Sequence, residues 1–308
     1  MLQVRTGEHG ECSQVNGSTI PPSWRDAAET LRHSRGFIVI LGDVDSGKST
    51  LCTYLANTCI DHRVRTSIID GDVGQAEIGP PTTTSSSSVS KHIFSLQERR
   101  PERSYFIGDI NPSLVLDKLV QSIARLKDEL STRSEITILN TDGWVRDEAV
   151  GHKLQLLNSL RPDLVLGLSL DNELDPILEL QQYPTLRLKA SSHARTRTRE
   201  ERKKAREEGY RRFLQNPKHL DLRLNTIKLR TFNAPKQQRI DQASTHKGNL
   251  AGLLDEEGIL LSIGRIVRIG NGTVRITTTA EEKPRIVELG AVILSSRFDE
   301  IRYEPYIE

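Results

Sequence analysis

Residues 37–50 read Phe37-Ile38-Val39-Ile40-Leu41-Gly42-Asp43-Val44-Asp45-Ser46-Gly47-Lys48-Ser49-Thr50. The first five residues are apolar and predict a buried strand, and apolar residues at helical spacing predict a helix over Lys48–Thr58. Between these two elements, Gly42–Thr50 fits the pattern G-x-x-x-x-G-K-[ST] of a phosphate-binding loop, the P-loop. The segment therefore predicts a nucleotide site at the junction of a strand and a helix.

The residue types of this loop suit the phosphates of a nucleotide. Glycines let backbone N–H groups turn toward phosphate oxygens, and the N-terminus of the following helix presents partial positive charge to the same anion. Lys48 can reach the β and γ phosphates, Ser49 can supply a hydroxyl to Mg²⁺, and Thr50 faces the same region. We therefore expect all nine residues of Gly42–Thr50 to take part in phosphate binding.

Strand and helix patterns alternate along the first half of the chain. Strands are predicted at 37–41, 66–69, 105–107, 136–140 and 164–168, and helices at 48–58, 112–130 and 147–160. Such alternation is typical of βαβ units with right-handed crossovers. It predicts an α/β fold with a doubly wound parallel sheet covered by helices on both sides.

A second acidic motif follows the next predicted strand. Asp70 and Asp72 lie in the run Ile68-Ile69-Asp70-Gly71-Asp72-Val73-Gly74-Gln75, at the strand end where open α/β sheets bind their ligands. One of two such acids can bind a Mg²⁺-linked water, while the other acts as a base that accepts a proton from an attacking hydroxyl. An acidic turn after a strand is also common without any function, so it is the nearby P-loop that favours Asp70 and Asp72 as metal and catalytic residues.

Composition excludes several classes of protein. The chain has 308 residues, 36% hydrophobic and 27% charged, so it can bury a substantial core without disulfides. No apolar run approaches the ~20 residues that span a bilayer, and the N-terminus has no signal-peptide pattern, so we expect neither a membrane nor a secreted protein. Three cysteines without metal-ligand spacing favour a reducing cytoplasm, with Cys52 and Cys59 buried as small hydrophobic residues.

The rest of the chain divides into segments of different character. Pro80–Ser90, rich in Pro, Thr and Ser, has the composition of a surface loop. Residues 187–212 hold 11 Lys plus Arg against four Glu, so the chain's net charge of +2 conceals a strongly basic segment in an otherwise net negative chain. From Gly248 onward, short apolar alternations separated by Gly-rich turns predict a small antiparallel β appendage.

Several separated motifs stand in a fixed order along the chain: Gly42–Thr50, Asp70–Gln75 with Ile78–Thr83, Phe106–Pro112, Asn140–Trp144 and the Arg-rich Arg199–Phe213. Together they resemble the motifs of a known family, the polynucleotide 5′-hydroxyl-kinases of RNA processing. This family includes the kinase subunit of pre-mRNA cleavage factor and tRNA splicing, the pre-ribosomal RNA kinases and archaeal relatives. The resemblance covers residues 35–215 well and the β appendage weakly, and the form Gly79-Pro80-Pro81-Thr82-Thr83 is most similar to that of archaeal members.

The resemblance implies transfer of the ATP γ-phosphate to a 5′-hydroxyl of RNA, or possibly DNA, with ATP and Mg²⁺ as cofactors; it specifies no protein partner. It implies that Lys48 stabilises the moving phosphoryl group, that Ser49 binds Mg²⁺, and that Asp72 acts near the attacking hydroxyl with support from Asp70 and Gln75. Trp144 matches a nucleotide-stacking tryptophan, although a core aromatic is the ordinary alternative. Asn111 takes the place of the family's frequent Thr or Ser before Pro112 and is expected to contact RNA with different geometry.

The Arg-rich segment resembles the family's lid. Arg202, Arg206 and Arg211 occupy the best-matching positions, and Arg202 and Arg206 are spaced i, i+4, so they share a helix face. Their guanidinium groups can neutralise charge on the equatorial oxygens of a phosphoryl-transfer transition state. The alternative is a solvated helix whose arginines pair with the interspersed glutamates.

These motifs divide the chain into five parts: an N-terminal extension (1–35), a P-loop kinase core (36–190), an Arg-rich lid (191–217), a connecting segment (218–247) and a small β-rich C-terminal domain (248–308).

Two other functions remain open. One is an RNA-processing scaffold that binds ATP without turnover, and the other is a different P-loop ATPase. The absence of an Asn-Lys-x-Asp guanine-reading motif disfavours a GTPase.

Overall fold

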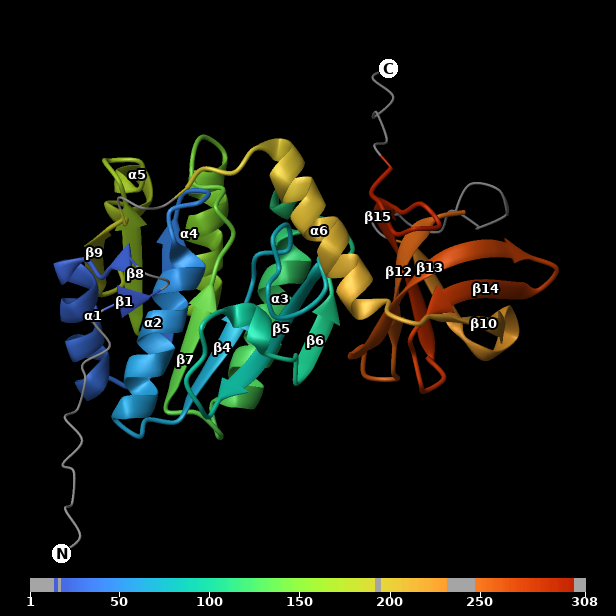
Figure 1. Cartoon of the computed structure of the whole chain (residues 1–308), viewed down its shortest axis with the longest axis horizontal. Helices are drawn as coiled ribbons and strands as arrows, with labels where there is room; N and C mark the ends of the chain where they lie inside the picture. Colours follow the sequence, from blue (N-terminus) through green and yellow to red (C-terminus); the bar gives the residue numbers. More distant parts are fainter. Residues whose placement is uncertain (1–13, 16–17, 192–194, 232–246, 302–308) are drawn as a thin grey trace, which may run out of the picture.

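The core of the molecule is a seven-stranded sheet in which the P-loop strand β3 lies between β7 and β8 (Figure 1). The computed structural model describes residues 14–15, 18–191, 195–231 and 247–301. The strand order is β6-β5-β4-β7-β3-β8-β9. These strands are β3 (Gly36–Gly42), β4 (Thr66–Asp70), β5 (Thr83–Val89), β6 (Arg103–Phe106), β7 (Ile136–Asn140), β8 (Leu164–Ser169) and β9 (Thr185–Lys189).

Helices cover both faces of this sheet. Because successive residues of a strand point to opposite sides, Ile38 and Ile40 of β3 join the cluster under α1 and α2, while Val39 and Leu41 join the cluster under α3, α4 and α5. The prediction of an α/β core with helices on both sides is therefore confirmed. The helical elements of the core are α1 (Pro22–His33), α2 (Lys48–Asp61), η1 (Leu96–Glu98), η2 (Pro112–Leu114), α3 (Leu116–Leu130), α4 (Ala149–Leu160) and α5 (Asp175–Leu178).

The sheet is mixed rather than wholly parallel. Strands β4, β7, β3 and β8 run parallel, as predicted, and so does β9, which was not predicted, but β5 is antiparallel to both β4 and β6. The prediction of a surface loop at Pro80–Ser90 is therefore wrong, because most of this segment, Thr83–Val89, forms the buried strand β5. The hydroxyls find partners inside the protein: Thr84 Oγ1 donates to the Asp70 carbonyl at 2.9 Å, and Ser85 Oγ lies 2.7 Å from Ser104 Oγ. Hydrogen bonding removes the cost of burying these polar groups.

The C-terminal part forms a second sheet of six strands, in the order β10-β14-β13-β12-β15-β11. Adjacent strands within this sheet are antiparallel, except that β11 runs parallel to β15. Residues 218–231, expected to be a connector, contribute the edge strands β10 and β11 and the turn η3 (Leu224–Thr226) to this unit. The strands are β10 (Lys218–Arg223), β11 (Lys228–Thr231), β12 (Asn249–Leu254), β13 (Leu260–Gly270), β14 (Thr273–Thr278) and β15 (Ile286–Ile293).

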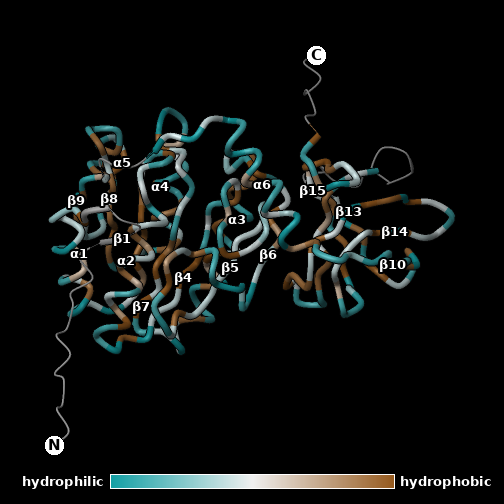
Figure 2. The backbone as a smooth tube through the Cα atoms, in the orientation of Figure 1, coloured by the Kyte–Doolittle hydropathy of each residue, from teal (hydrophilic) through white to brown (hydrophobic). Residues whose placement is uncertain are grey.

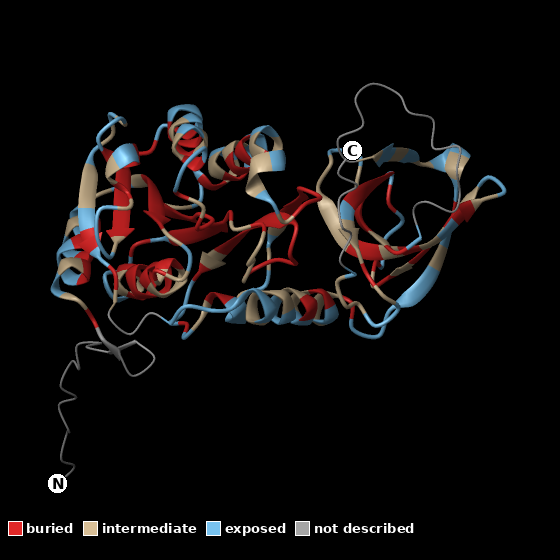
Figure 3. Ribbon diagram, turned by 90° about the horizontal axis from the view of Figure 1, so that it is seen from above, coloured by how far each residue is buried: buried red, intermediate tan, exposed pale blue. Residues whose placement is uncertain are grey.

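Helix α6 (Arg199–Phe213) joins the two sheets and corresponds to the predicted lid (Figure 1). A capping box, in which Thr198 and Glu201 exchange hydrogen bonds with each other's backbone, fixes its start. Near its other end, Tyr210 and Leu214 pack with Phe106 of the core and Leu250 of the C-terminal sheet. Figure 3 shows the buried residues running through both units, and Figure 2 shows hydrophobic stretches along the strands of both units.

The N-terminal part contributes the short hairpin β1 (Gln14–Val15) with β2 (Ser18–Thr19) and the helix α1, which packs on α2 and β9. Cys52 and Cys59 are free and buried, which confirms their predicted packing role, while Cys12 lies outside the described residues. Among the residues that the structure describes, no helix is long and apolar enough to cross a membrane.

Candidate nucleotide and phosphoryl-transfer site

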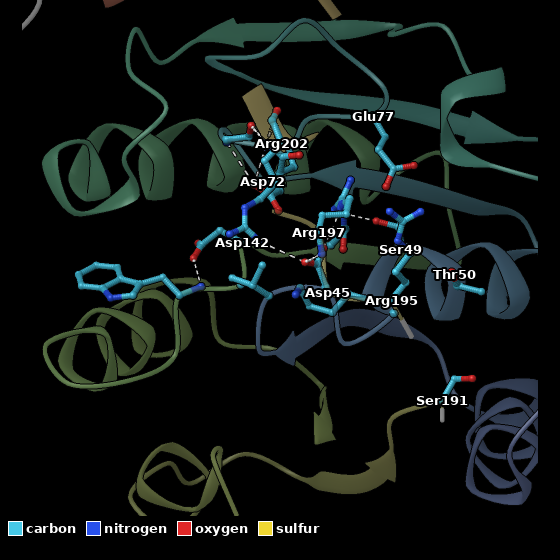
Figure 4. A pocket seen from close by; sticks show the side chains of 18 of the residues that line it. Asp45, Ser49, Thr50, Asp72, Glu77, Asp142, Ser191, Arg195, Arg197 and Arg202 are labelled. Atoms are coloured by element: carbon cyan, nitrogen blue, oxygen red, sulfur yellow. Dashed lines mark hydrogen bonds and ion pairs between the residues drawn. The ribbon is translucent and has the colours of Figure 1, made fainter. Parts of the chain in front are cut away.

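A pocket of about 600 Å³ opens where the parallel strands β3, β4 and β7 end. Four segments that are far apart in sequence meet there: the P-loop, the turns after β4 and β7, and the lid (Figure 4). Ile20, Pro21 and Trp24 of the N-terminal part also line the pocket. The pocket thus lies where the fold class places ligands.

The P-loop has the backbone geometry that phosphate binding requires. Gly47 has φ +99° and Asp45 has φ +60°, so the loop curls back on itself before α2 begins at Lys48. Lys48 Nζ donates to the carbonyls of Gly42 at 3.0 Å and Asp43 at 2.8 Å. This places a buried ammonium at the base of the loop, within the pocket.

Acidic groups offset the cost of burying this lysine. Burial lowers the pKa of Lys48, while the neighbouring Asp72 carboxylate opposes that shift most strongly. Burial likewise raises the pKa of Asp72 to about 6, and repulsion from Asp142 adds to this effect while Lys48 opposes it. Lys48, Asp72 and Asp142 therefore form one electrostatic unit at the pocket floor.

Asp70 and Asp72 differ in what their carboxylates contact. Asp72 Oδ1 accepts the backbone N–H groups of Gly74 at 3.1 Å and Gln75 at 2.9 Å, and its side chain lines the pocket. Asp70 is not among the lining residues; its Oδ2 accepts the N–H groups of Glu77 at 2.7 Å and Ile78 at 3.1 Å. Asp72 is thus oriented to meet a ligand, whereas Asp70 holds the loop that follows β4.

The turn after β7 brings Trp144 to the pocket. Its backbone N–H donates to Asp142 Oδ1 at 2.9 Å, and its ring meets His152 edge-on with centroids 4.8 Å apart. Asp142 is also held by a buried ion pair with Lys153 at 2.7 Å. Gly143 lies so close to the P-loop that a Cβ would stand 2.6 Å from the Val44 backbone, so this position accepts no larger residue without a shift of the loop.

The lid is fastened to the P-loop by an acidic residue of that loop. The Asp45 side chain is only 3% exposed and accepts hydrogen bonds from Arg197 Nε at 2.8 Å, the Arg197 backbone N–H at 2.8 Å and Arg202 Nη1 at 3.1 Å. Two lid arginines are therefore held at the pocket, as Figure 4 shows.

Farther along α6, the predicted lid arginines pair with the C-terminal part of the chain. Arg206 lines the pocket, but Nε and Nη2 donate to the two carboxylate oxygens of Glu300 at 2.6 and 2.7 Å. Arg211 pairs with Asp299 and does not line the pocket. Arg202 and Arg206 are thus the predicted arginines that the fold brings to the nucleotide site.

Most of the sequence-predicted residues meet in this pocket. Those that line it are Val44, Asp45, Gly47, Lys48, Ser49, Thr50, Asp72, Gln75, Trp144, Arg202 and Arg206. Gly42, Asp43 and Ser46 complete the P-loop beneath them. Asn111 is exposed just outside, with Oδ1 accepting the Ser113 backbone N–H at 3.1 Å as the cap of η2.

Sequence reasoning missed four charged residues that line the pocket: Glu77, Asp142, Arg195 and Arg197. Asp142 follows strand β7 as Asp72 follows β4, so the same strand-end signal could have found it. Arg197 precedes the lid helix and was outside the predicted i, i+4 face. Glu77 had no signal of its own.

The donors around Ser49 fit a divalent cation of the Mg²⁺ type, which takes oxygen ligands and is usually shared with substrate phosphates. Ser49, Asp72 and Glu77 all present oxygen atoms to the pocket. Asn140 Oδ1 and Gln75 Oε1 are buried and have no hydrogen-bond partner in the described part of the chain. Across the residues with described positions, no group of three His, Cys, Asp or Glu forms a metal cage, so the nucleotide would complete the ligand set.

The fold and pocket define a P-loop nucleotide-binding protein with an Arg-rich helix beside the pocket. More specifically, the chain belongs to the family described as the mRNA cleavage and polyadenylation factor CLP1 P-loop, whose model matches residues 42–216. That range begins in the P-loop and ends just beyond α6. The family that the motifs resemble is thereby confirmed.

Curated relatives agree with this assignment. The chain is 33% identical to a polyribonucleotide 5′-hydroxyl-kinase of Pyrococcus abyssi over 255 residues, which cover 83% of this chain and 70% of the relative. It is 37% identical to one of Pyrococcus horikoshii over 190 residues, covering 62% and 53%. A solved complex of Clp1p with a Pcf11p segment has the same fold, with a TM-score of 0.70 at 12% identity over 88% of this chain and 78% of that one.

Proposed function

We propose that the protein is an ATP- and Mg²⁺-dependent polynucleotide 5′-hydroxyl-kinase that acts on RNA. The observation that carries this proposal is the single pocket in which Lys48, Asp72, Trp144 and the lid arginines converge. The names of its polyribonucleotide 5′-hydroxyl-kinase relatives support the same reaction. We also propose a cytoplasmic location, which the free thiols Cys52 and Cys59 favour.

In this reaction the 5′-oxygen of the RNA attacks the γ-phosphorus of ATP, the bond to the β-phosphate oxygen breaks, and ADP leaves. Asp72 is positioned to accept the proton of the attacking hydroxyl. Lys48 and the lid arginines that line the pocket would neutralise charge on the phosphoryl oxygens. A Mg²⁺ ion at Ser49 would supply further charge neutralisation.

The direct test is transfer of label from γ-labelled ATP to 5′-hydroxyl RNA and DNA oligonucleotides in the presence of Mg²⁺. We expect label on the 5′ end of RNA. A protein that binds ATP but labels neither nucleic acid would be the scaffold instead, and ATP hydrolysis without acceptor labelling would indicate another P-loop ATPase.

Trp144→Ala is expected to weaken RNA binding. Stacking of a base on an aromatic ring contributes about 1–3 kcal/mol, so KM for RNA should rise by roughly 5- to 150-fold while kcat changes little. Trp144→Phe keeps a ring and serves as the matched control, with KM close to that of the wild type. An unchanged KM in Trp144→Ala would assign the ring to packing against His152 rather than to RNA.

Arg202→Ala and Arg206→Ala are expected to lower kcat by at least about tenfold, and by more than they weaken ATP binding, because contacts to the transferring phosphoryl strengthen in the transition state. Steady-state kinetics with a separate ATP-binding titration separates the two effects. Arg199→Ala, at an exposed position of the same helix that does not line the pocket, is the control. If either variant lost ATP affinity and kcat/KM to the same extent while kcat stayed intact, the arginine would only bind ATP, and its proposed role in the transition state would be contradicted.

A further inference from the structure

After β15, the last strand of the C-terminal sheet, the chain returns to the lid helix α6. The Ile301 backbone N–H donates to the carbonyl of Ile293, where β15 ends, at 2.9 Å. One residue earlier, the Glu300 backbone N–H donates to Glu207 Oε1 of α6 at 3.0 Å, and the hydroxyl of the buried Tyr210 donates to Glu300 Oε1 at 3.2 Å. Glu300 is therefore held by both the C-terminal sheet and the lid helix.

The Glu300 carboxylate holds the guanidinium group of Arg206 through two parallel hydrogen bonds. Nε and Nη2 donate to the two carboxylate oxygens at 2.6 and 2.7 Å, and the side chains of Arg206 and Glu300 are only 15% and 10% exposed. Burial alone would lower the pKa of Arg206, but the hydrogen bonds to Glu300 and its charge raise that pKa overall. Two parallel bonds fix the plane of a guanidinium group as well as its position, so Glu300 determines how Arg206 is oriented.

Arg206 lines the nucleotide pocket while Glu300 holds it. A guanidinium group has five N–H hydrogens, and this pair uses one from Nε and one from Nη2. The Nη1 group and the second hydrogen of Nη2 lie outside the pair and can donate to phosphoryl oxygens. Arg206 can thus act on a phosphoryl group without leaving Glu300.

Holding an arginine before the substrate arrives favours catalysis. The side chain has several rotatable bonds, and freezing them costs conformational entropy. Because Glu300 fixes Arg206 in the folded protein, the barrier of the reaction does not include this cost.

We propose that Glu300 is a positioning residue that holds Arg206 in the pocket, so that the C-terminal sheet supports phosphoryl transfer through the lid helix. The inference rests on the proposed function in assuming that a phosphoryl group is transferred in this pocket. It gives the C-terminal part of the chain a role in the reaction, although no described residue beyond Arg206 lines the pocket.

The first test is the steady-state kinetics of RNA phosphorylation by the full chain. Glu300→Ala is expected to lower kcat about tenfold or more, and no further than Arg206→Ala does, while KM for ATP changes less than about threefold. Glu300→Gln keeps the shape of the side chain and one acceptor oxygen, so its kcat should lie between those of the wild type and Glu300→Ala. A higher kcat in Glu300→Ala would show that Glu300 restrains Arg206 instead, and an unchanged kcat would show that the pair only joins two parts of the chain; either result would overturn the proposal.

A double variant makes the test specific for Arg206. In an Arg206→Ala background, Glu300→Ala should lower kcat no further, because both changes remove the same interaction. Losses that multiply would show that Glu300 acts apart from Arg206 and would contradict the proposal. Glu256→Ala, which removes an exposed glutamate paired with Arg285 in the same C-terminal part and away from the pocket, is the matched control, and thermal unfolding checks that each variant is folded.

Binding of ADP with Mg²⁺ and aluminium fluoride, a mimic of the transferring phosphoryl group, gives a readout that needs no RNA. Glu300→Ala is expected to weaken this complex about tenfold while the affinity for ADP alone changes less than about threefold, because the contact of Arg206 is made to the phosphoryl group. A wild-type protein that labels RNA but whose kcat and aluminium fluoride complex ignore Glu300 would refute the positioning role alone. A protein that labels no nucleic acid, yet whose Glu300→Ala variant loses the aluminium fluoride complex, would refute the kinase and leave the positioning role standing.

Discussion

Lys48→Ala is expected to reduce phosphoryl transfer by about 10³-fold or more, because it removes the buried cation at the base of the P-loop. Loss of one preorganised donor aimed at developing charge commonly costs 10²–10³-fold in kcat, and a lysine contributes a full charge in addition. The Lys48 ammonium is held in one place, since the residue is only 7% exposed and its Nζ donates to two carbonyls of the loop. The measurement is single-turnover transfer from ATP to a 5′-hydroxyl RNA.

The loss should be catalytic rather than structural. The two carbonyls that Lys48 contacts belong to Gly42 and Asp43, and water that enters the pocket can take the place of the ammonium beside them. We therefore expect a thermal midpoint within a few degrees of the wild type. Lys204→Ala, which removes an exposed lysine of the lid helix, should leave transfer unchanged. A Lys48→Ala protein with near-normal turnover would show that the pocket is not the site of phosphoryl transfer.

The parts of the site that the sequence predicted are those determined locally. A strand, a Gly-rich turn and a helix are adjacent in sequence, so Gly42–Thr50 predicts both its own geometry and the position of Lys48 and Ser49. Asp72 could be placed for a similar reason, because residues that follow neighbouring parallel strands gather at one edge of the sheet.

The parts that were not predicted depend on contacts between distant segments. Asp45 meets Arg197 across 152 positions, and Arg206 meets Glu300 across 94. No periodicity in the sequence encodes such pairs, so the attachment of the lid to both the P-loop and the C-terminal part could only be seen in the fold. The metal, catalytic and RNA-binding roles of Asp70, Arg211 and Asn111 stay predictions, although none of the three lines the pocket.

Strand β5 shows a different limit. Its run Thr83–Val89 has a composition that favours a loop, because hydroxyl side chains usually compete with regular backbone hydrogen bonding. In the fold these hydroxyls bond to one another and to neighbouring carbonyls, and the small side chains fit between β4 and β6. Composition alone does not reveal whether polar groups will find partners inside the protein.

Asp72→Asn is expected to lower kcat by about 10²–10⁴-fold, the usual contribution of a positioned general base. The substitution keeps the shape of the side chain and an oxygen that can accept the N–H groups of Gly74 and Gln75, so the loop after β4 should stay in place. It removes only the capacity to accept a proton and the negative charge facing Lys48. Asp142→Asn, at the other acid of the pocket floor, provides a comparison because its carboxylate is already paired with Lys153.

The pH dependence of the wild type offers a second measure of the same role. Burial raises the pKa of Asp72 to about 6 in the nucleotide-free protein, so the carboxyl is mostly protonated at pH 5 and mostly ionised at pH 7. A base works only when ionised, and kcat/KM reports the protonation state of the free enzyme. We therefore expect kcat/KM to fall about tenfold per pH unit below pH 6 and to be level above it.

The two measurements together separate a base from a group that only orients the metal or the loop. If Asp72 accepts the proton, the acid limb near pH 6 should disappear from the residual activity of Asp72→Asn, since the amide does not titrate. If the limb persists in Asp72→Asn with the same midpoint, another group controls it, and Asp70 is the candidate because burial also raises its pKa to about 6. Asp70 does not line the pocket, so an acid limb that depended on it would reflect the loop that it holds and not the removal of the substrate proton.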